Sequence, residues 1–263
     1  MIAHAEPVEA KPRGLRRAWG GLIGAITFLT IIPIPATASR QKRFDLGDTL
    51  AWFPLVGAAI GAFAGGLRVA CQPLFGRGPS TAIAMVGLVV ISGALHQDAL
   101  ADTADGLGVR GDRARRLAAM RDSATGAFGV LALIGWALLL FSTLESLTAI
   151  HALRALIAAC AAGRLAALLH AAGAPPARQD GLGAGLRITP MRAAIGALIA
   201  LVVTVAAAGI PGGLVSAGAC GVVSGVSAVL ARRTLGGSTG DTIGAAVAVT
   251  EVAVCLALLV TWH

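Results

Sequence analysis

Long apolar runs, separated by short loops rich in glycine, proline and arginine, dominate this sequence. Hydrophobic residues fill 56% of the 263 positions and charged residues only 13%, against about 25% charged residues in a soluble domain. Because a bilayer offers no water to unpaired backbone groups, such runs must fold as membrane helices. We therefore expect an all-α, polytopic integral membrane bundle that lies in the lipid bilayer, without a soluble domain or a nucleic-acid partner.

Seven of the apolar runs predict transmembrane helices. They are residues 50–70, 80–95, 128–147, 149–172, 193–209, 214–231 and 242–262. The second run is expected to continue as a helix into an acidic stretch. Pro211, followed by two glycines, predicts a tight turn between the fifth and sixth runs.

The chain begins with a basic tail, predicted over residues 1–18, and residues 19–263 are expected to form a single membrane-embedded catalytic domain. Residues 19–34 are apolar, but this run is short and ends at Pro33 and Pro35. Basic residues flank it on both sides, which argues against a full crossing. We expect an interfacial or re-entrant segment here.

The distribution of arginine predicts the orientation of the bundle. The net charge is +8, and most arginines lie in four loops, residues 40–48, 97–125, 173–192 and 232–241. These loops share one side of the membrane if the seven helices alternate. The intervening loops are short and poor in charge. Because cytoplasmic loops carry the excess of basic residues, this side is predicted to face the cytoplasm, with the carboxyl terminus outside.

Three aspartates follow the second apolar run in the stretch LHQDALADTADG, residues 95–106. Asp98, Asp102 and Asp105 are spaced i, i+4 and i+7, so on a helix they fall within about 60° of arc. Carboxylate oxygens on one face suit Mg²⁺. The alternative is a solvated helix face just outside the membrane.

Energetics restricts where these carboxylates lie. One charged residue at the bilayer centre costs roughly 2.5–3.5 kcal/mol on insertion scales. We therefore expect the three aspartates at the cytoplasmic mouth of the bundle, or in a water-filled cavity that opens there. Either position is accessible to a soluble substrate that carries phosphate.

Two further segments have side chains suited to binding phosphate. Arg121, Asp122 and Ser123 follow a short basic helix predicted over residues 112–121, whose alternative role is to bind anionic lipid. Residues 236–241 (GGSTGD) form a glycine-rich turn that opens the last helix. There Thr239 and Asp241 either contact phosphate or metal, or belong to an ordinary N-cap.

Arg164 and Glu251 lie deep inside predicted membrane helices, where neither can face lipid cheaply. They either form a buried ion pair or contribute to the site. His96 lies about 200° from Asp98 on a continuous helix, so it faces away from the aspartates unless the helix breaks. An orienting residue and a plain cap are both compatible with His96.

Residues 96–106 (HQDALADTADG) resemble the HxDGLADTxDG signature of the cobalamin synthase family, the adenosylcobinamide-GDP ribazoletransferases. Further matches come in the family's order and cover nearly the whole chain. They are residues 27–30 with Pro33, residues 53–57, residues 120–123 with Gly126, and residues 237–244 with Glu251. Ala99 stands where the family usually has glycine, which affects only the local backbone.

The resemblance implies a bacterial inner-membrane enzyme of vitamin B12 nucleotide-loop assembly. The ribose 3′-hydroxyl of α-ribazole, or its 5′-phosphate, attacks the corrinoid-side phosphate of adenosylcobinamide-GDP, GMP leaves, and Mg²⁺ is required. A homo-oligomer is compatible with this reading. The catalytic residues are then Asp98, Asp102 and Asp105, which also bind metal with Asp122 or Asp241, while the substrate contacts are Arg121, Asp122, Ser123, Arg164 and Thr239.

Two other functions are weighed against this one. A CDP-alcohol phosphotransferase normally has a DGxxAR string and a second pair of aspartates, whereas here Asp105-Gly106 is followed by LGVR and no second pair appears. A cation or organic-anion transporter favours acidic residues spaced through the membrane depth. In this chain only Glu251 is deep.

Overall fold

The computed structural model describes residues 14–34, 46–178 and 188–262. Within these ranges the chain is helical, and its only β-type contact is one bridge between Pro176 and Ser238. The helices are α1 (Gly14–Leu29), α2 (Leu46–Leu50), α3 (Phe53–Phe75), α4 (Arg77–Ile91), α5 (Leu95–Gly108), α6 (Arg113–Ala119), α7 (Ala127–Ser146), α8 (Ala149–Gly173), α9 (Pro190–Leu235) and α10 (Gly240–Trp262). The all-α prediction is confirmed.

Five helices of the described chain, α3, α7, α8, α9 and α10, are long and apolar enough to cross a membrane. α4 and α5 pass the same test only as a pair, and they are bent by 86° at the break between them. Counting that pair gives six spans. The multi-pass bundle is therefore confirmed, whereas the count of seven stays a prediction.

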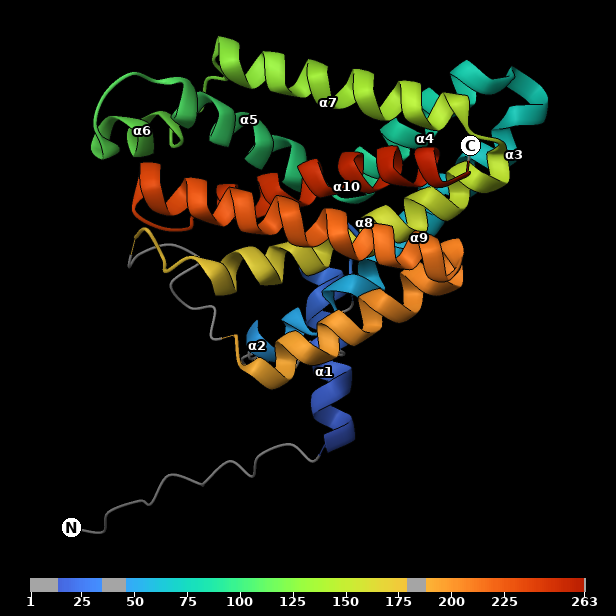
Figure 1. Cartoon of the computed structure of the whole chain (residues 1–263), viewed down its shortest axis with the longest axis horizontal. Coiled ribbons are helices and arrows are strands. Elements are labelled where there is room, and N and C mark those ends of the chain that lie inside the picture. Colours follow the sequence, from blue (N-terminus) through green and yellow to red (C-terminus); the bar gives the residue numbers. More distant parts are fainter. Residues whose placement is uncertain (1–13, 35–45, 179–187, 263) are drawn as a thin grey trace.

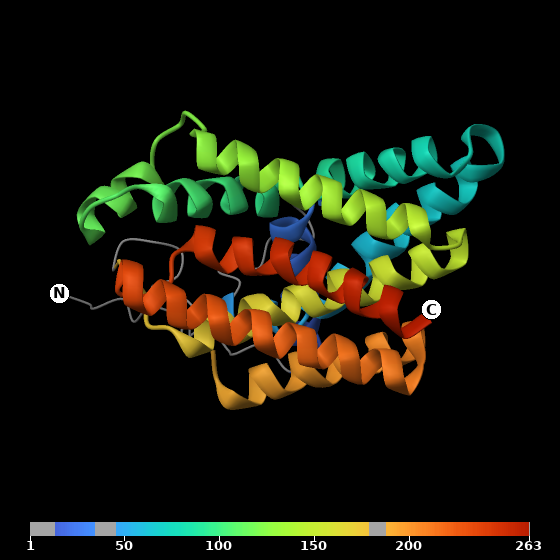
Figure 2. The same cartoon turned by 45° about the horizontal axis from the view of Figure 1, so that its top comes forward.

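α9 contains both the fifth and the sixth predicted spans. Its backbone leaves helical geometry at Gly209, where φ is 75° and ψ is 174°, two residues before Pro211. Proline cannot donate to the helical hydrogen-bond ladder, and the positive φ suits glycine. Figures 1 and 2 show the two parts of α9 lying side by side in opposite directions. The chain thus reverses close to the predicted turn.

α8 is the central helix, because α3, α9 and α10 make their most extensive contacts with it. It is rich in buried alanine, and small residues let helices approach closely in a membrane. The facing ridge of α3 consists of Gly57, Gly61 and Gly65. A Cβ atom on Gly57 would overlap the carbonyl oxygen of Cys160, and one on Gly61 would overlap that of Leu156. These glycines set the distance between the two helices.

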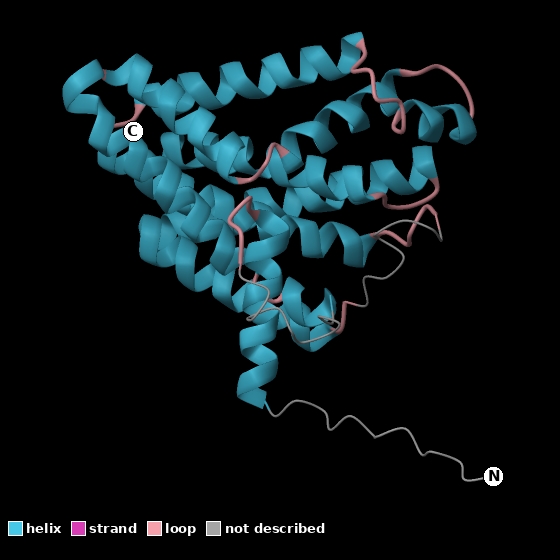
Figure 3. Cartoon of the chain, turned by 180° about the vertical axis from the view of Figure 1, so that it is seen from behind, coloured by secondary structure: helices cyan, strands magenta, loops and turns pink. Residues whose placement is uncertain are grey.

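α1 runs across the direction of the other long helices, as Figures 1 and 3 show from opposite sides. Its apolar part is too short to be counted as a span, and its Ala25 and Leu29 are buried in the core. This arrangement agrees with the predicted interfacial or re-entrant segment. The helix begins at Gly14, inside the range predicted as a tail, whereas residues 1–13 lie outside the described residues.

The described parts of the arginine-rich loops meet at one end of the bundle, which we call the basic end (Figure 1). Guanidinium groups join these loops by donating to backbone carbonyls: Arg113 to Ala177, Arg178 to Leu117, and Arg232 to Gly173. At the opposite end lie the α3–α4 and α7–α8 turns. Among the described residues the arginine-rich loops thus lie at one end of the bundle, as predicted, while the membrane side that this end faces stays a prediction.

The α3–α8 contact yields a stability test. Gly61→Ala should lower the stability of the purified protein by about 1–3 kcal/mol, because the added methyl group forces two backbones apart. Thermal unfolding in detergent measures the effect. Gly66→Ala is the matched control, since a Cβ atom there meets nothing within 4 Å. Equal melting temperatures for the two variants would contradict the packing described here.

Candidate functional site

The acidic stretch forms its own helix, α5, because α4 ends in a Schellman motif. Gly93 has a φ of 60°, its N–H donates to the Val90 carbonyl at 3.0 Å, and the Ala94 N–H donates to the Val89 carbonyl at 2.8 Å. This pair of bonds closes a helix at its carboxyl end. The expectation of one helix running from residue 80 through the aspartates is therefore wrong. The bend of 86° instead gives α5 a direction different from that of α4.

A cavity of about 440 Å³ opens beside the first turns of α5 and α10. Most of its wall is apolar and comes from α1, α2, α3, α8 and α10. Its ionisable side chains are His96 and Asp98 from α5, Arg164 from α8, and Asp241 from α10. The fold thus brings three of the predicted site residues, Asp98, Arg164 and Asp241, to one cavity.

The three aspartates of α5 have different surroundings. Asp98 is exposed and lines the cavity, whereas Asp102 and Asp105 are half-buried. The Asp105 carboxylate accepts hydrogen bonds from the backbone N–H groups of Gly126 at 2.7 Å and Gly129 at 2.8 Å. It therefore satisfies unpaired N–H groups at the start of α7, where a negative charge is also favoured by the helix dipole.

The predicted metal ligands do not form a ready-made cage. Within residues 14–34, 46–178 and 188–262, no three His, Cys, Asp or Glu side chains are grouped closely enough to hold an ion. α5 nevertheless carries three carboxylates and no lysine or arginine, and Asp241 of α10 lines the same cavity as Asp98. Like charges gathered in this way favour a bound cation.

The glycine-rich turn before α10 is closed by reciprocal hydrogen bonds. The Thr239 N–H donates to the Thr242 hydroxyl at 2.9 Å, and the Thr242 N–H donates to the Thr239 hydroxyl at 3.1 Å. The Thr239 hydroxyl also lies 3.4 Å from the Asp241 carboxylate. Thr239 thus has the ordinary capping role and positions Asp241, while its contact with substrate stays a prediction.

A buried histidine, to which the sequence assigned no role, supports this turn. His170 of α8 places Nε2 at 3.2 Å from the Thr242 hydroxyl and Nδ1 at 2.8 Å from the Ser227 hydroxyl. It is fully buried. His170 therefore links α8, α9 and the start of α10. The only sign of this role in the sequence was the position of a histidine inside an apolar run.

Arg121, Asp122 and Ser123 lie in an exposed turn after α6. The Asp122 carboxylate accepts from the Ala124 N–H at 3.0 Å, and the preceding Met120 packs against Gly106 of α5. The turn therefore lies near the Asp105 end of α5. None of the three residues lines the cavity, so their roles in binding substrate or metal stay predictions.

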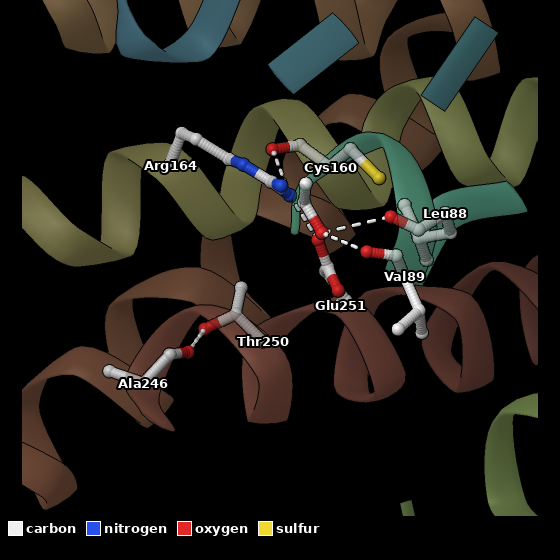
Figure 4. Close-up of polar contacts among 8 residues, drawn as sticks. Leu88, Val89, Cys160, Arg164, Ala246, Thr250 and Glu251 are labelled. Atoms are coloured by element: carbon white, nitrogen blue, oxygen red, sulfur yellow. Dashed lines mark hydrogen bonds and ion pairs between the residues drawn. The ribbon is translucent and has the colours of Figure 1, made fainter. Parts of the chain in front are cut away.

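Arg164 and Glu251 form the buried ion pair that was one of two interpretations of the sequence. Figure 4 shows Arg164 reaching from α8 to Glu251 on α10, and each residue is only 1% exposed. Arg164 Nε and Glu251 Oε2 have no hydrogen-bond partner among the described residues. Because Arg164 also lines the cavity, the pair joins the structural core to the site.

His96 is enclosed at the first turn of α5 and is 5% exposed. It lines the same cavity as Asp98, although a continuous helix predicted that it would face away from the aspartates. Close by, α5 packs on α10 through Gly244, where a Cβ atom would lie 2.5 Å from that of Ala99. The methyl group of Ala99 occupies the space that a side chain at 244 would need.

Comparison with known proteins adds family information to this geometry. Residues 21–259 match the family model described as Cobalamin-5-phosphate synthase. Proteins named adenosylcobinamide-GDP ribazoletransferase from Azorhizobium caulinodans and Mesorhizobium japonicum are each 36% identical to this chain. The first alignment covers 90% of this chain and 94% of the relative, and the second covers 88% and 89%.

A protein of the same name from Klebsiella pneumoniae subsp. pneumoniae is 35% identical to this chain, over 89% of this chain and 97% of the relative. No solved structure is significantly similar to this chain.

The buried ion pair yields a stability test in which a second substitution is expected to restore stability that the first one removes. Glu251→Leu should destabilise the protein by about 3–5 kcal/mol, because it leaves the Arg164 charge buried without its partner. The double variant Arg164→Met/Glu251→Leu should be more stable than the single variant, since it removes both charges. Thermal unfolding in detergent compares the two. A double variant less stable than the single one would contradict a buried pair.

Proposed function

This chain belongs to the cobalamin-5-phosphate synthase family, and we propose on that premise that it completes the nucleotide loop of cobalamin. In this reaction the adenosylcobinamide-phosphate group of adenosylcobinamide-GDP passes to α-ribazole or α-ribazole 5′-phosphate, and GMP is released. The observation that carries the proposal is the meeting of Asp98, Arg164 and Asp241 at one cavity. Carboxylates and a guanidinium from three helices suit chemistry on a diphosphate.

The transfer is a displacement at phosphorus. A ribose hydroxyl oxygen of the acceptor bonds to the corrinoid-side phosphorus, the bond from that phosphorus to the GMP oxygen breaks, and the hydroxyl proton passes to a carboxylate at the cavity mouth. No serine or cysteine is among the described residues that line the cavity. Direct displacement is therefore simpler than a covalent enzyme intermediate.

The residues at the cavity fit Mg²⁺ that arrives with the substrate. Mg²⁺ is usually held by one or two protein carboxylates together with substrate phosphates and water, and Asp98 and Asp241 supply two carboxylates from different helices. Asp102, Asp105 and Asp122 are the other proposed ligands. When bound, the ion neutralises diphosphate charge and stabilises the departing GMP.

Arg164 is the proposed phosphate contact inside the cavity, since it lines the wall and Nε lacks a partner among the described residues. Arg121, Ser123 and Thr239 complete the proposed substrate contacts at the basic end. By the positive-inside rule the basic end faces the cytoplasm of a bacterial inner membrane. Soluble nucleotides then reach the carboxylates without crossing the bilayer.

The aspartate helix provides the test of this function. Asp102→Asn should lower GMP release by at least about 100-fold, because it removes a carboxylate that holds Mg²⁺, and loss of one electrostatic stabiliser of the transition state has an effect of this size. The assay uses purified protein in lipid nanodiscs with adenosylcobinamide-GDP and α-ribazole 5′-phosphate, with and without Mg²⁺.

Asp112→Asn is the matched control for this assay. Asp112 caps α6 by accepting from the Arg115 N–H at 3.0 Å and does not line the cavity, so full activity is expected. Normal turnover by the Asp102→Asn variant would contradict the catalytic role proposed for the α5 aspartates. Unchanged activity after a chelator has removed Mg²⁺ would contradict the proposed need for the ion.

A further inference from the structure

One wall of the cavity contains a stacked pair of aromatic rings, from the buried Phe53 and the partly exposed Phe28. Phe28 of α1 and Phe53 of α3 have ring centroids 5.6 Å apart and an interplanar angle of 18°, and both line the cavity. The aliphatic side chains of Leu50, Ile243 and Val247 extend this apolar wall. A wall of this kind suits a flat, apolar ligand group that packs against aromatic rings.

The size of the cavity limits what it can take. Its volume of about 440 Å³ lies in the range of pockets for small ligands, which suits a nucleoside. A corrin macrocycle with its side chains is far larger than a nucleoside. The adenosylcobinamide part of the donor must therefore remain outside.

His96 adds a polar group that lacks a partner. Its side chain is 95% buried, being 5% exposed, and neither Nδ1 nor Nε2 has a hydrogen-bond partner among the described residues. Leaving a buried donor and acceptor unpaired costs free energy. A neutral imidazole offers one donor and one acceptor, which suits a ribose hydroxyl placed at this wall of the cavity.

We infer that this cavity is the acceptor site: it takes α-ribazole with the benzimidazole base against Phe28 and Phe53 and the ribose hydrogen-bonded to His96. This inference rests on the proposed function and names which of the two substrates the cavity holds.

His96 is two residues from Asp98 on α5, and a Cβ atom on Gly244 of α10 would lie 3.8 Å from His96 Nδ1. A ribose held by His96 therefore lies near the first turns of α5 and α10, which carry Asp98 and Asp241. The diphosphate of the donor then meets the acceptor beside Asp98, Asp241 and Arg164, the residues proposed above to act on it.

Guanine of the donor is the rival planar group, and the wall chemistry argues against it. The edge of guanine carries several hydrogen-bond donors and acceptors, and burying them without partners is costly. The described wall beside the phenylalanines is aliphatic apart from the hydroxyl groups of Thr27 and Thr49, and the Thr27 hydroxyl already donates to the Ile23 carbonyl at 2.9 Å. The base of α-ribazole carries methyl groups on its corresponding edge, so burial of that edge is favourable.

The test separates the two substrates kinetically. Phe28→Ala and His96→Ala should each raise KM for α-ribazole about tenfold, because the first variant loses a stacking contact with the base and the second loses a hydrogen bond to the ribose. KM for adenosylcobinamide-GDP should stay within about twofold. His96→Gln, which retains a donor and an acceptor, should recover part of the loss.

Phe75→Ala is the matched control, because Phe75 is on α3, is 55% exposed and does not line the cavity. Melting temperatures of all variants show whether they are folded. A rise in KM for adenosylcobinamide-GDP alone would assign the cavity to guanine and overturn the inference. Unchanged KM values for both substrates would overturn it as well.

Equilibrium binding distinguishes failure of this inference from failure of the proposed function. Radiolabelled α-ribazole should bind the wild-type protein in nanodiscs without the donor, and Phe28→Ala should weaken that binding about tenfold. This result supports the acceptor site even if no GMP is released in the assay. Tighter binding of guanosine than of α-ribazole, or no binding of α-ribazole, would contradict the inference.

Discussion

The buried ion pair between Arg164 and Glu251 holds the site to the core of the bundle. An unpaired charge is costly to bury inside a membrane bundle. The need to keep Arg164 and Glu251 paired therefore fixes the position of α10 relative to α8. α10 in turn positions α5, because Gly244 leaves room only for the small side chain of Ala99. The carboxylates of both helices therefore reach the same cavity as a consequence of packing.

Helix ends supply much of the remaining geometry. α4 ends at Ile91 in a motif closed by Gly93, and the acidic segment therefore forms a separate helix, α5, at a sharp angle. Asp105 then caps α7, and Thr239 caps α10 and positions Asp241. Two predicted site residues thus have structural contacts that also place their neighbours. Because these residues stabilise helix ends as well as the site, a substitution there can lower activity by destabilising the fold, and the melting temperature of each variant must be measured beside its activity.

The sequence predicted what depends on local spacing and on the cost of burying charge. The three aspartates share one helix and the described arginine-rich loops gather at one end, as expected, and Arg164 pairs with Glu251, which was one of the two interpretations left open. The break at Gly93 was missed although a Ser-Gly pair was its signal, because the apolar run continued past it. The roles of Phe28, Phe53 and His170 were not predictable, since each depends on which distant helices meet.

The central claim is that Asp98 and Asp241 act together on the diphosphate of the substrate. Binding of Mn²⁺, a paramagnetic substitute for Mg²⁺, tests it directly by electron paramagnetic resonance in nanodiscs. We predict tight binding only when adenosylcobinamide-GDP is present, and its loss in the variant Asp98→Asn/Asp241→Asn. Tight binding without the diphosphate substrate, or binding that survives both substitutions, would contradict the account.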